Sequence, residues 1–560
     1  MSIFALALLA LAPIVLVLVL MVGMRWPATK AMPLTWLVAA CLAAAVWKMD
    51  PMLIAASTLS GFGSAINVLI IVFGAILILY TLRESGAMET ISAGFYGISA
   101  DRRIQTIIIA FMFGAFIEGS AGFGTPAAIA APLLLGLGFP AMAAVVVCLV
   151  LNSFPVTFGA VGTPVWFGLK NLRQQVNQDT IEGVSGLGTA GFDIFLQHIA
   201  QWSTLLHAVM IYMLPLLTVC FLTGVFGKNK SWREGLGVWK FSFFASTVFF
   251  VPYAATAFAF GEEFPALLGG LAGLAIIIFA AQRGFLLPKE DWDFADRDQW
   301  SADWVGSIPS GTSDLKQHMS QFQAWLPYFL IAGLLVLTRL SSLPFKEMLN
   351  SVAFSWNSIL GYDTVNFTMK PLYLPGIIPF TLVAILTAFL HRMEVGKVTK
   401  AWGDAFKALK NPTIAMFFAV AMVEIFKQSG NNPQQYLSMP LTMADASAAM
   451  VGDVWPAFAA FVGALGSFIT GSATVSNLLF AEFQYGVAST IHMNPEVIVA
   501  LQAVGGAMGN MICVHNIVAA SATVGLIGME GMILRRTFPP LLAYGATVGL
   551  AGALLIFVIL

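Results

Sequence analysis

The chain has 560 residues, of which 59% are hydrophobic and only 10% are charged, whereas about a quarter of the residues in soluble domains are charged. A soluble fold could not bury that much apolar surface, and a net charge of −1 offers no basic surface for nucleic acid. We therefore expect a protein of the lipid bilayer with no nucleic-acid partner.

Apolar segments of roughly 18 or more residues recur along the chain, long enough to cross the roughly 30 Å hydrocarbon layer as helices. A β-barrel is excluded, because its strands would alternate in character. The N-terminal segment lacks the basic start and cleavage site of a signal peptide, so we expect it to be retained. The predicted apolar segments are 3–24, 32–48, 61–82, 104–168, 203–227, 239–260, 264–283, 322–341, 372–390, 411–427, 454–534 and 537–560.

Two of these segments, 104–168 and 454–534, are long enough to hold several passes each. We predict a single all-α polytopic transmembrane domain over 1–560, with about 12 to 14 membrane segments, some of them incomplete. It would contain a first core repeat module at 104–168 and a second at 454–534.

Lys and Arg mark the cytoplasmic loops of membrane proteins. Here they gather at 25–30, 83–103, 228–240, 391–410 and 535–536. The loops that are poorer in basic residues, or acidic, are 49–60, 171–202, 262–263, 342–371 and 429–453. If the basic loops all face the cytoplasm, both termini lie on the opposite side of the membrane. Alternation then makes 284–321 a polar cytoplasmic loop.

An internal repeat connects the two modules. Residues 114–121 read Gly-Ala-Phe-Ile-Glu-Gly-Ser-Ala and residues 466–473 read Gly-Ser-Phe-Ile-Thr-Gly-Ser-Ala, identical at six of eight positions. Each copy is followed by a second small-residue segment, at 159–164 and at 506–511. The predicted threading enters the two copies from opposite sides, so the repeats are expected to be inverted.

Helix breakers inside the repeats predict broken or re-entrant helices. Residues 118–126 contain three glycines and a proline, too many for a continuous helix. The matching 470–477 has fewer breakers and more hydroxyl and amide groups. Backbone freed from a helix at membrane depth must line a wet cavity or be satisfied by protein. Its exposed N–H groups suit a carboxylate. The alternative is that these small residues only allow close helix packing, as Gly505 and Gly509 would.

Inverted repeats with broken helices are a recurrent design of secondary transporters. We therefore expect the breaks to bind the substrate of such a carrier. The candidate substrate-binding residues are Ser120, Gly122, Gly124, Thr125, Thr163, Ser472, Thr474, Ser476, Asn477, Asn510 and Asn516.

Two ionisable residues in the modules are candidates for proton coupling. Glu118 stands in an uncharged region, where a carboxyl either pairs or takes up a proton; the alternative is a structural carboxylate bonded to backbone N–H groups. His515 could relay protons or simply pack between helices. Glu424 and Lys427 are three residues apart and are expected to form a local pair.

Sequence signatures of an enzyme, a metal site or an ATP-driven pump are absent: there is no HExxH, Walker loop or GxSxG. No cofactor or metal is expected. A channel is the remaining alternative, but a duplicated broken-helix unit in one chain favours alternating access.

The motifs resemble those of the bacterial L-lactate permease family, over nearly the whole chain. The blocks that carry the resemblance are 118–126, 135–139, 158–164, 470–477 and 522–528. The resemblance implies import of lactate, and in some relatives glycolate, with protons across the cytoplasmic (inner) membrane of a bacterium. Analogy with other carriers built from re-entrant hairpins suggests a homodimer. Sodium coupling stays open, because 470–477 offers the oxygen-rich broken helix that sodium sites use.

Overall fold

The computed structural model describes residues 1–559 apart from 25, 96, 123, 182–190, 312–315, 340–342 and 527. Among these residues the structure is helical except for two short antiparallel strands, β1 (Phe354–Trp356) and β2 (Phe367–Met369). Ten described helices are long and apolar enough to cross a membrane, or up to twelve if each of two bent pairs counts as one span. The predicted all-α polytopic architecture is confirmed.

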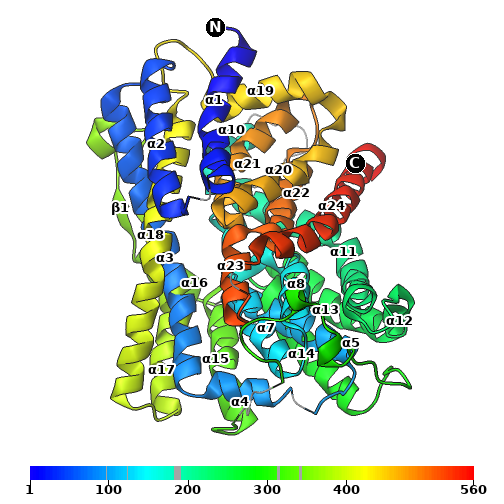
Figure 1. The fold of residues 1–560 in the computed structure, drawn as a ribbon. Coiled ribbons are helices and arrows are strands. Elements are labelled where there is room, and N and C mark those ends of the chain that lie inside the picture. The colour runs from blue at the N-terminus through cyan, green and yellow to red at the C-terminus, as the bar shows by residue number, and fades with distance from the viewer. Residues whose placement is uncertain are drawn as a thin grey trace.

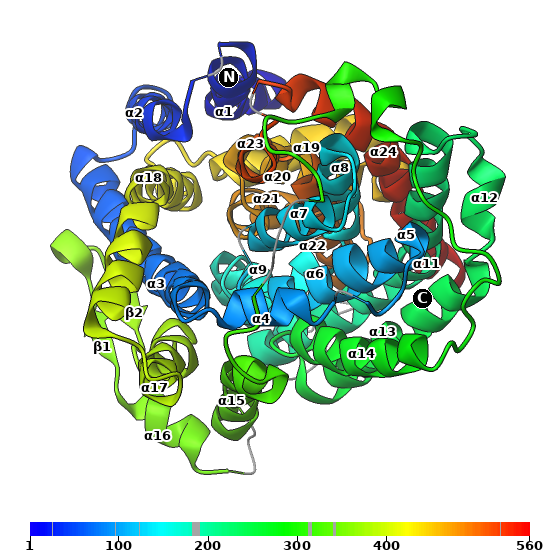
Figure 2. The same cartoon turned by 60° about the horizontal axis from the view of Figure 1, so that its bottom comes forward.

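The helices form two units that lie side by side (Figures 1 and 2). The flanking unit, which curves around one side of the molecule in Figure 2, consists of α2 (Ala28–Ala45), α3 (Pro51–Glu84), α15 (Gln321–Arg339), α16 (Phe345–Ser351), α17 (Leu382–Leu390), α18 (Val395–Gln428) and the two strands. Helices α1 (Ile3–Leu18), α4 (Ala87–Ala93) and α19 (Met439–Val451) connect it to the central unit.

The central unit holds both repeats and the helices that enclose them. Its first part comprises α5 (Arg102–Gln105), α6 (Gly114–Ser120), α7 (Thr125–Gly136), α8 (Ala141–Leu151), α9 (Gly159–Trp166), α10 (Arg173–Ile181), α11 (Gly191–Phe226), α12 (Trp232–Leu236), α13 (Trp239–Phe260) and α14 (Pro265–Gln282). Its second part comprises α20 (Pro456–Thr470), α21 (Ala473–Thr490), α22 (Pro495–Met508), α23 (Val514–Thr523) and α24 (Glu530–Leu554).

The first hairpin, residues 102–136, enters the central unit and returns to the side from which it came. A π-helical segment, Thr106–Phe113, joins α5 to α6 into one arm, and α7 is the returning arm. The Arg102 guanidinium lies 5.9 Å from the ring of Phe139. The beginning and end of the segment therefore meet at one face, as they do in a re-entrant hairpin rather than a span.

The second hairpin, residues 456–490, has the same design. Beside its start, the Trp455 indole donates a hydrogen bond of 2.8 Å to Gln484 Oε1 on the returning arm. Further in, the Ser476 hydroxyl donates to the Gly463 carbonyl at 2.7 Å. In Figure 1 the first hairpin occupies the lower half of the molecule and the second the upper half. The two hairpins thus enter from opposite faces, in agreement with the predicted inversion.

The charge-based threading places the N-terminus and the segment 391–410 on opposite sides of the membrane. The N-terminus and the turn between α17 and α18 lie at opposite ends of the molecule (Figure 1). The turn carries the basic segment predicted to face the cytoplasm, and the N-terminus was predicted to face outside. Leu560, the other terminus in that prediction, lies outside the described residues.

Residues 284–311, from the predicted polar loop, form a strap across the mouth of the first hairpin. Asp293 pairs with Arg102 at 2.9 Å, and the Gly311 N–H donates to the Leu135 carbonyl at 2.9 Å. Asp303 pairs with Arg536 at 2.8 Å, which ties the strap to α24 as well. The described part of the loop is therefore bound to the central unit and does not form a separate lobe.

Candidate functional site

The tip of the first hairpin is a tight turn between α6 and α7. Gly122 and Gly124 have φ angles of +63° and +74°, a region that residues with a side chain rarely adopt. Pro126 then falls in the first turn of α7, where its missing N–H removes no helical bond. Glu118, in the last turn of α6, is only 2% exposed. The glycines and proline that predicted a break thus make one, directly after a buried carboxyl.

The tip of the second hairpin has one left-handed residue, Gly471, at φ +78°. Ser472 follows and caps α21, its hydroxyl accepting a 3.4 Å bond from the Val475 N–H. Thr470 holds the place in the repeat that Glu118 holds in the first copy, and its hydroxyl donates to the Gly466 carbonyl at 2.8 Å. This tip is therefore polar without being ionisable.

A broken span follows each hairpin, at the second small-residue segment of each repeat. In the first repeat, Ala160 and Val161 have φ angles of +42° and +57°, which for a β-branched residue is a genuine outlier. The carbonyls freed by this break are bonded: the Thr163 hydroxyl donates to Ala160 O at 2.5 Å, and the Trp166 indole donates to Val161 O at 3.1 Å. Strain of this kind concentrates at functional sites.

In the second repeat the break separates α22 from α23. A 3-10 turn at Gly509–Ile512 and an extended Cys513 interrupt the span. The Asn516 amide donates to Asn510 Oδ1 at 2.5 Å across the break. Thr163 and Asn510 hold matching places in the two repeats, each one residue after the last glycine of its segment.

The two tips and the two breaks enclose one small cavity. Its volume is about 20 Å³, which is close to the space of a single water molecule. A monocarboxylate can enter only after the walls have moved apart. The cavity is lined by Glu118, Gly122, Val156, Gly159, Ala160, Thr163, Pro164, Gly471, Ser472, Ala473, Thr474 and Asn510.

The candidate residues divide into those that line the cavity and those that lie behind its walls. Both hairpin tips and both breaks are represented in the first group. Those lining the cavity are Glu118, Gly122, Thr163, Ser472, Thr474 and Asn510. Those absent from its lining are Ser120, Gly124, Thr125, Ser476, Asn477, His515 and Asn516.

Several residues behind the walls hold the two repeats together. The Asn477 amide of the second hairpin donates a 2.8 Å bond to the Pro164 carbonyl, freed at the first break. Gly124 of the first hairpin packs directly against the Asn516 side chain on α23. Each tip is thus fastened to the broken span of the other repeat.

The remaining three hydroxyls of this group donate within their own hairpins. The Ser120 hydroxyl donates to the Ile117 carbonyl at 3.1 Å, and the Thr125 hydroxyl donates to the Gly122 carbonyl. Ser476 donates to Gly463, as described above, and accepts a 3.1 Å bond from the Gln502 amide. These groups stabilise the tips.

His515 lies beside Gly471 at the outer surface of α23 and is exposed. Its ring has no hydrogen bond or ion pair to any residue that the structure describes. It is separated from Glu118, so the structure does not bring the two candidate proton-coupling residues into one cavity.

Glu118 has one strong partner, which the sequence did not reveal. The Asn152 amide donates a 2.9 Å bond to Glu118 Oε2, and Gly159 packs against Oε1. Among the described residues no cation comes within ion-pair distance of this carboxyl. A carboxylate there lacks a neutralising charge, whereas a protonated carboxyl needs none. Asn152 could have been noticed as the first polar side chain after an apolar run of eleven residues, 141–151.

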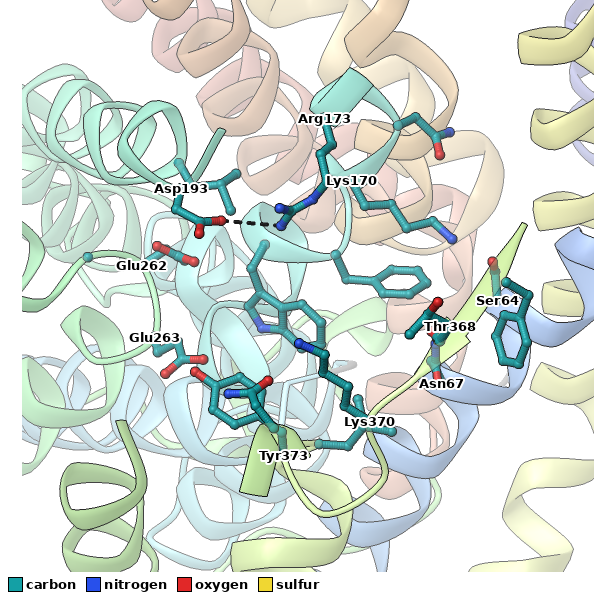
Figure 3. A pocket seen from close by; sticks show the side chains of 18 of the residues that line it. Ser64, Asn67, Lys170, Arg173, Asp193, Glu262, Glu263, Thr368, Lys370 and Tyr373 are labelled. Carbon is teal, nitrogen blue, oxygen red and sulfur yellow. Dashed lines mark hydrogen bonds and ion pairs between the residues drawn. The ribbon is translucent and has the colours of Figure 1, made fainter. Parts of the chain in front are cut away.

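A larger cavity of about 960 Å³, which we call the vestibule, lies between the central and flanking units (Figure 3). Trp166, Phe167 and Lys170 line it from the central unit. Three ion pairs stand in its wall: Lys170–Glu424 at 3.8 Å, Arg173–Asp193 at 3.2 Å and Arg339–Glu263 at 2.7 Å. Two of them, at Lys170 and Arg339, join the central unit to the flanking unit.

The first of these pairs corrects an expectation. Glu424 was expected to pair with Lys427 on its own helix, but it contacts Lys170 of the other unit.

At the turn between α13 and α14, burial and the neighbouring Glu263 raise the pKa of Glu262 to about 7. No three His, Cys, Asp or Glu side chains in the described part of the chain gather as a metal site.

Comparison with known proteins gives consistent results. A family model described as L-lactate permease matches residues 6–559. A protein of Haemophilus influenzae is 31% identical over 570 residues, covering 98% of both chains. The glycolate permease of Escherichia coli is 27% identical and covers 99% of this chain and 96% of its own. Among solved structures, the YdaH transporter of Alcanivorax borkumensis has a TM-score of 0.46 at 13% identity, covering 95% of this chain and 98% of that one.

Proposed function

The chain belongs to the L-lactate permease family, and we propose that it imports lactate, or a related 2-hydroxy monocarboxylate such as glycolate, by proton symport. The proposed location is the inner membrane of a bacterial cell. One observation carries the mechanism: the buried Glu118 lines the same small cavity as both hairpin tips.

The substrate is proposed to bind where the cavity is polar. Thr163, Thr474 and Asn510 bring hydroxyl and amide donors to its wall, and the N-terminus of α21 carries a partial positive charge. These groups can bond a carboxylate and a neighbouring 2-hydroxyl without any ion pair. Because the cavity holds about 20 Å³, binding requires it to expand.

The proton is proposed to bind Glu118 before the substrate does. An ionised Glu118 would repel a carboxylate in the same uncharged cavity, so the loaded state contains a neutral Glu118 and an anionic substrate. Moving one anion into a negative interior costs about 2.3 kcal/mol per 100 mV, and one accompanying proton cancels that charge. The symport is therefore electroneutral.

Uptake of labelled lactate, glycolate and pyruvate into proteoliposomes tests the proposal, with proton, sodium and electrical gradients imposed one at a time. An inward proton gradient is expected to drive accumulation, while a membrane potential alone does not. Accumulation driven by sodium but not by protons would replace the proposed coupling with the sodium alternative. Absence of uptake of all three acids would refute the substrate class.

A further inference from the structure

The vestibule has a charge composition that the small cavity lacks. Its lining contains six basic and four acidic side chains, an excess of two positive charges. The small cavity beside it contains Glu118 and no basic residue among its described lining. The basic residues of the vestibule are Lys170, Arg173, Arg339, Lys346, Lys370 and Lys427, and the acidic ones are Asp193, Glu262, Glu263 and Glu424.

Among the described residues, ion pairs occupy three of the four acidic side chains, all but Glu262, and three of the six basic ones. Three acids bind Lys170, Arg173 and Arg339. Lys346, Lys370 and Lys427 have no ion pair with any residue that the structure describes. Lys346 still lies in the electrostatic field of Glu262 and Glu263, and Lys427 in that of Glu482. Lys370, which is exposed, is the cation least compensated by the protein.

Figure 3 shows where these cations point. The Lys170 side chain extends away from Arg173 and Asp193 toward the side of the vestibule formed by Ser64 and Thr368. Lys370 enters the vestibule from the flanking unit on the side of Tyr373, away from Ser64 and Thr368. Next to Lys170, Asn171 is only 7% exposed and its amide nitrogen has no acceptor among the described residues. Cations from both units and a residue with a spare amide donor therefore line the vestibule.

The vestibule and the small cavity share a wall. Thr163 and Pro164 line the cavity, and Trp166, Phe167 and Lys170, a few residues further along the same segment, line the vestibule. An anion held in the vestibule is thus next to the site where the proposed function needs it.

We propose that the vestibule is a capture site for the substrate carboxylate, with Lys370 of the flanking unit and Lys170 of the central unit as its principal cations. The inference rests on the proposed function and adds an entry step to it. The carboxylate first meets cations in the vestibule and then passes to an uncharged cavity, where an ion pair would hold it too tightly to be released. An excess of one charge sign in a cleft raises the local concentration of an oppositely charged ligand, and salt weakens this effect.

Lys370→Gln tests the proposal, because Lys370 is exposed and its loss leaves no acid unpaired. Initial lactate uptake is measured in phosphatidylcholine vesicles at low and high ionic strength. At low ionic strength the KM is expected to rise about three- to tenfold, with the maximal rate retained, since the interaction precedes translocation. Lys370→Arg should restore the KM. High salt should raise the KM of the parent and leave that of Lys370→Gln nearly unchanged.

Lys407→Gln is the control, because Lys407 lies on α18 outside the vestibule and its side chain is 83% exposed. Its KM should equal that of the parent. An unchanged KM and salt dependence in Lys370→Gln, beside normal uptake by the parent, overturns the capture site alone. A lower maximal rate with the parental KM shows a structural role and also overturns it. An effect confined to vesicles with anionic lipid assigns Lys370 to a lipid headgroup instead. A parent that takes up no lactate overturns both proposals.

Discussion

The two hairpins have similar sequences and architecture but differ in chemistry. At matching places the first has Glu118 and the second Thr470, and the first has Gly122 where the second has Thr474. Glu118 receives its hydrogen bond from Asn152 on the span that follows. The first hairpin therefore brings a carboxyl that can carry a proton, and the second brings hydroxyls that can only donate or accept hydrogen bonds.

The hairpins also differ in what stabilises them. In the second, Gln484 and Gln502 bond each other at 3.0 Å, and Gln502 also donates to Ser476 and Asn477. The first has its side-chain network at the mouth, where Arg102 bonds Gln105 at 3.0 Å and Asp293 of the strap at 2.9 Å. A duplicated fold can thus keep its backbone while one copy carries a buried carboxyl and the other a network of polar side chains.

The largest effect is expected in the labelling of introduced cysteines from the two sides of the membrane. This labelling tests whether the two hairpins enter from opposite faces. In a background without cysteines, Asp453→Cys beside the second hairpin should react with an impermeant thiol reagent added outside intact cells. Asp293→Cys at the mouth of the first should react only after permeabilisation, because the basic loops face the cytoplasm. Labelling of both from one side would show that the hairpins enter from the same face.

Glu118→Gln is expected to abolish proton-driven accumulation and to retain lactate exchange. The amide mimics the protonated carboxyl, so the substrate still binds, but no proton is carried. Counterflow and gradient-driven uptake in proteoliposomes separate the two activities. Thr470→Val, at the matching place, should still accumulate lactate. If Glu118→Gln accumulates lactate as the parent does, Glu118 is not the proton carrier.

Gly159→Ala and Gly506→Ala compare the space at matching positions in the two breaks. A methyl group at 159 would lie 2.3 Å from Glu118 Oε1, whereas at 506 the nearest atom is Asn477 Oδ1 at 3.3 Å. Displacing the carboxyl should reduce uptake by about tenfold or more, since small misplacements of reacting groups cost that much. Gly506→Ala should stay within about twofold of the parent. Equal losses in both variants would mean that the breaks only need glycine for packing.

Gln502→Met should weaken the second hairpin by removing its network. Three donated contacts and one accepted bond are lost, and the Gln484 amide and the Ser476 and Asn477 oxygens lose a partner. We expect a loss of about 2–4 kcal/mol, seen as a lower thermal midpoint in detergent. An unchanged midpoint would assign the rigidity of this hairpin to apolar packing alone.

The smallest effect is expected in the pH dependence of stability, from Glu262 in the turn between α13 and α14. In the folded protein the pKa of Glu262 is about 7 because of burial and the neighbouring Glu263, while the unfolded value is close to 4.5. The folded state then binds the proton more tightly, so stability falls as pH rises from about 4.5 to 7 and levels off above. Glu262→Gln should flatten this dependence of the thermal midpoint. A slope as steep as that of the parent would show that another group titrates.

Much of the fold could be predicted because hydropathy, helix breakers and repeats are local properties. The breaks at 118–126 and 470–477 follow from residue types that cannot continue a helix, and the two copies identify each other. The distribution of Lys and Arg among the loops predicted that the two repeats are inverted relative to each other. None of these signals depends on knowing which helices pack together.

The contacts across the fold could not be predicted in this way. Glu424 lies one turn from Lys427, but a pair at this spacing gains only a few tenths of a kcal/mol, and a lysine from another unit stands closer. No periodicity connects Asn152 to Glu118 or the strap to Arg102. The candidate list therefore contained residues on the right segments, while only the three-dimensional structure separates those at the cavity from those behind it.

The bond from Asn477 to the Pro164 carbonyl, and the packing of Asn516 on Gly124, bear on the ancestry of the chain. Each half supplies the fastening that the other half's tip needs, and neither half encloses the cavity alone. A half-length ancestor could have built such a site only by binding a second copy of itself inserted upside down in the same membrane. Gene fusion would then have freed the two copies to diverge, one toward an acid and the other toward hydroxyls.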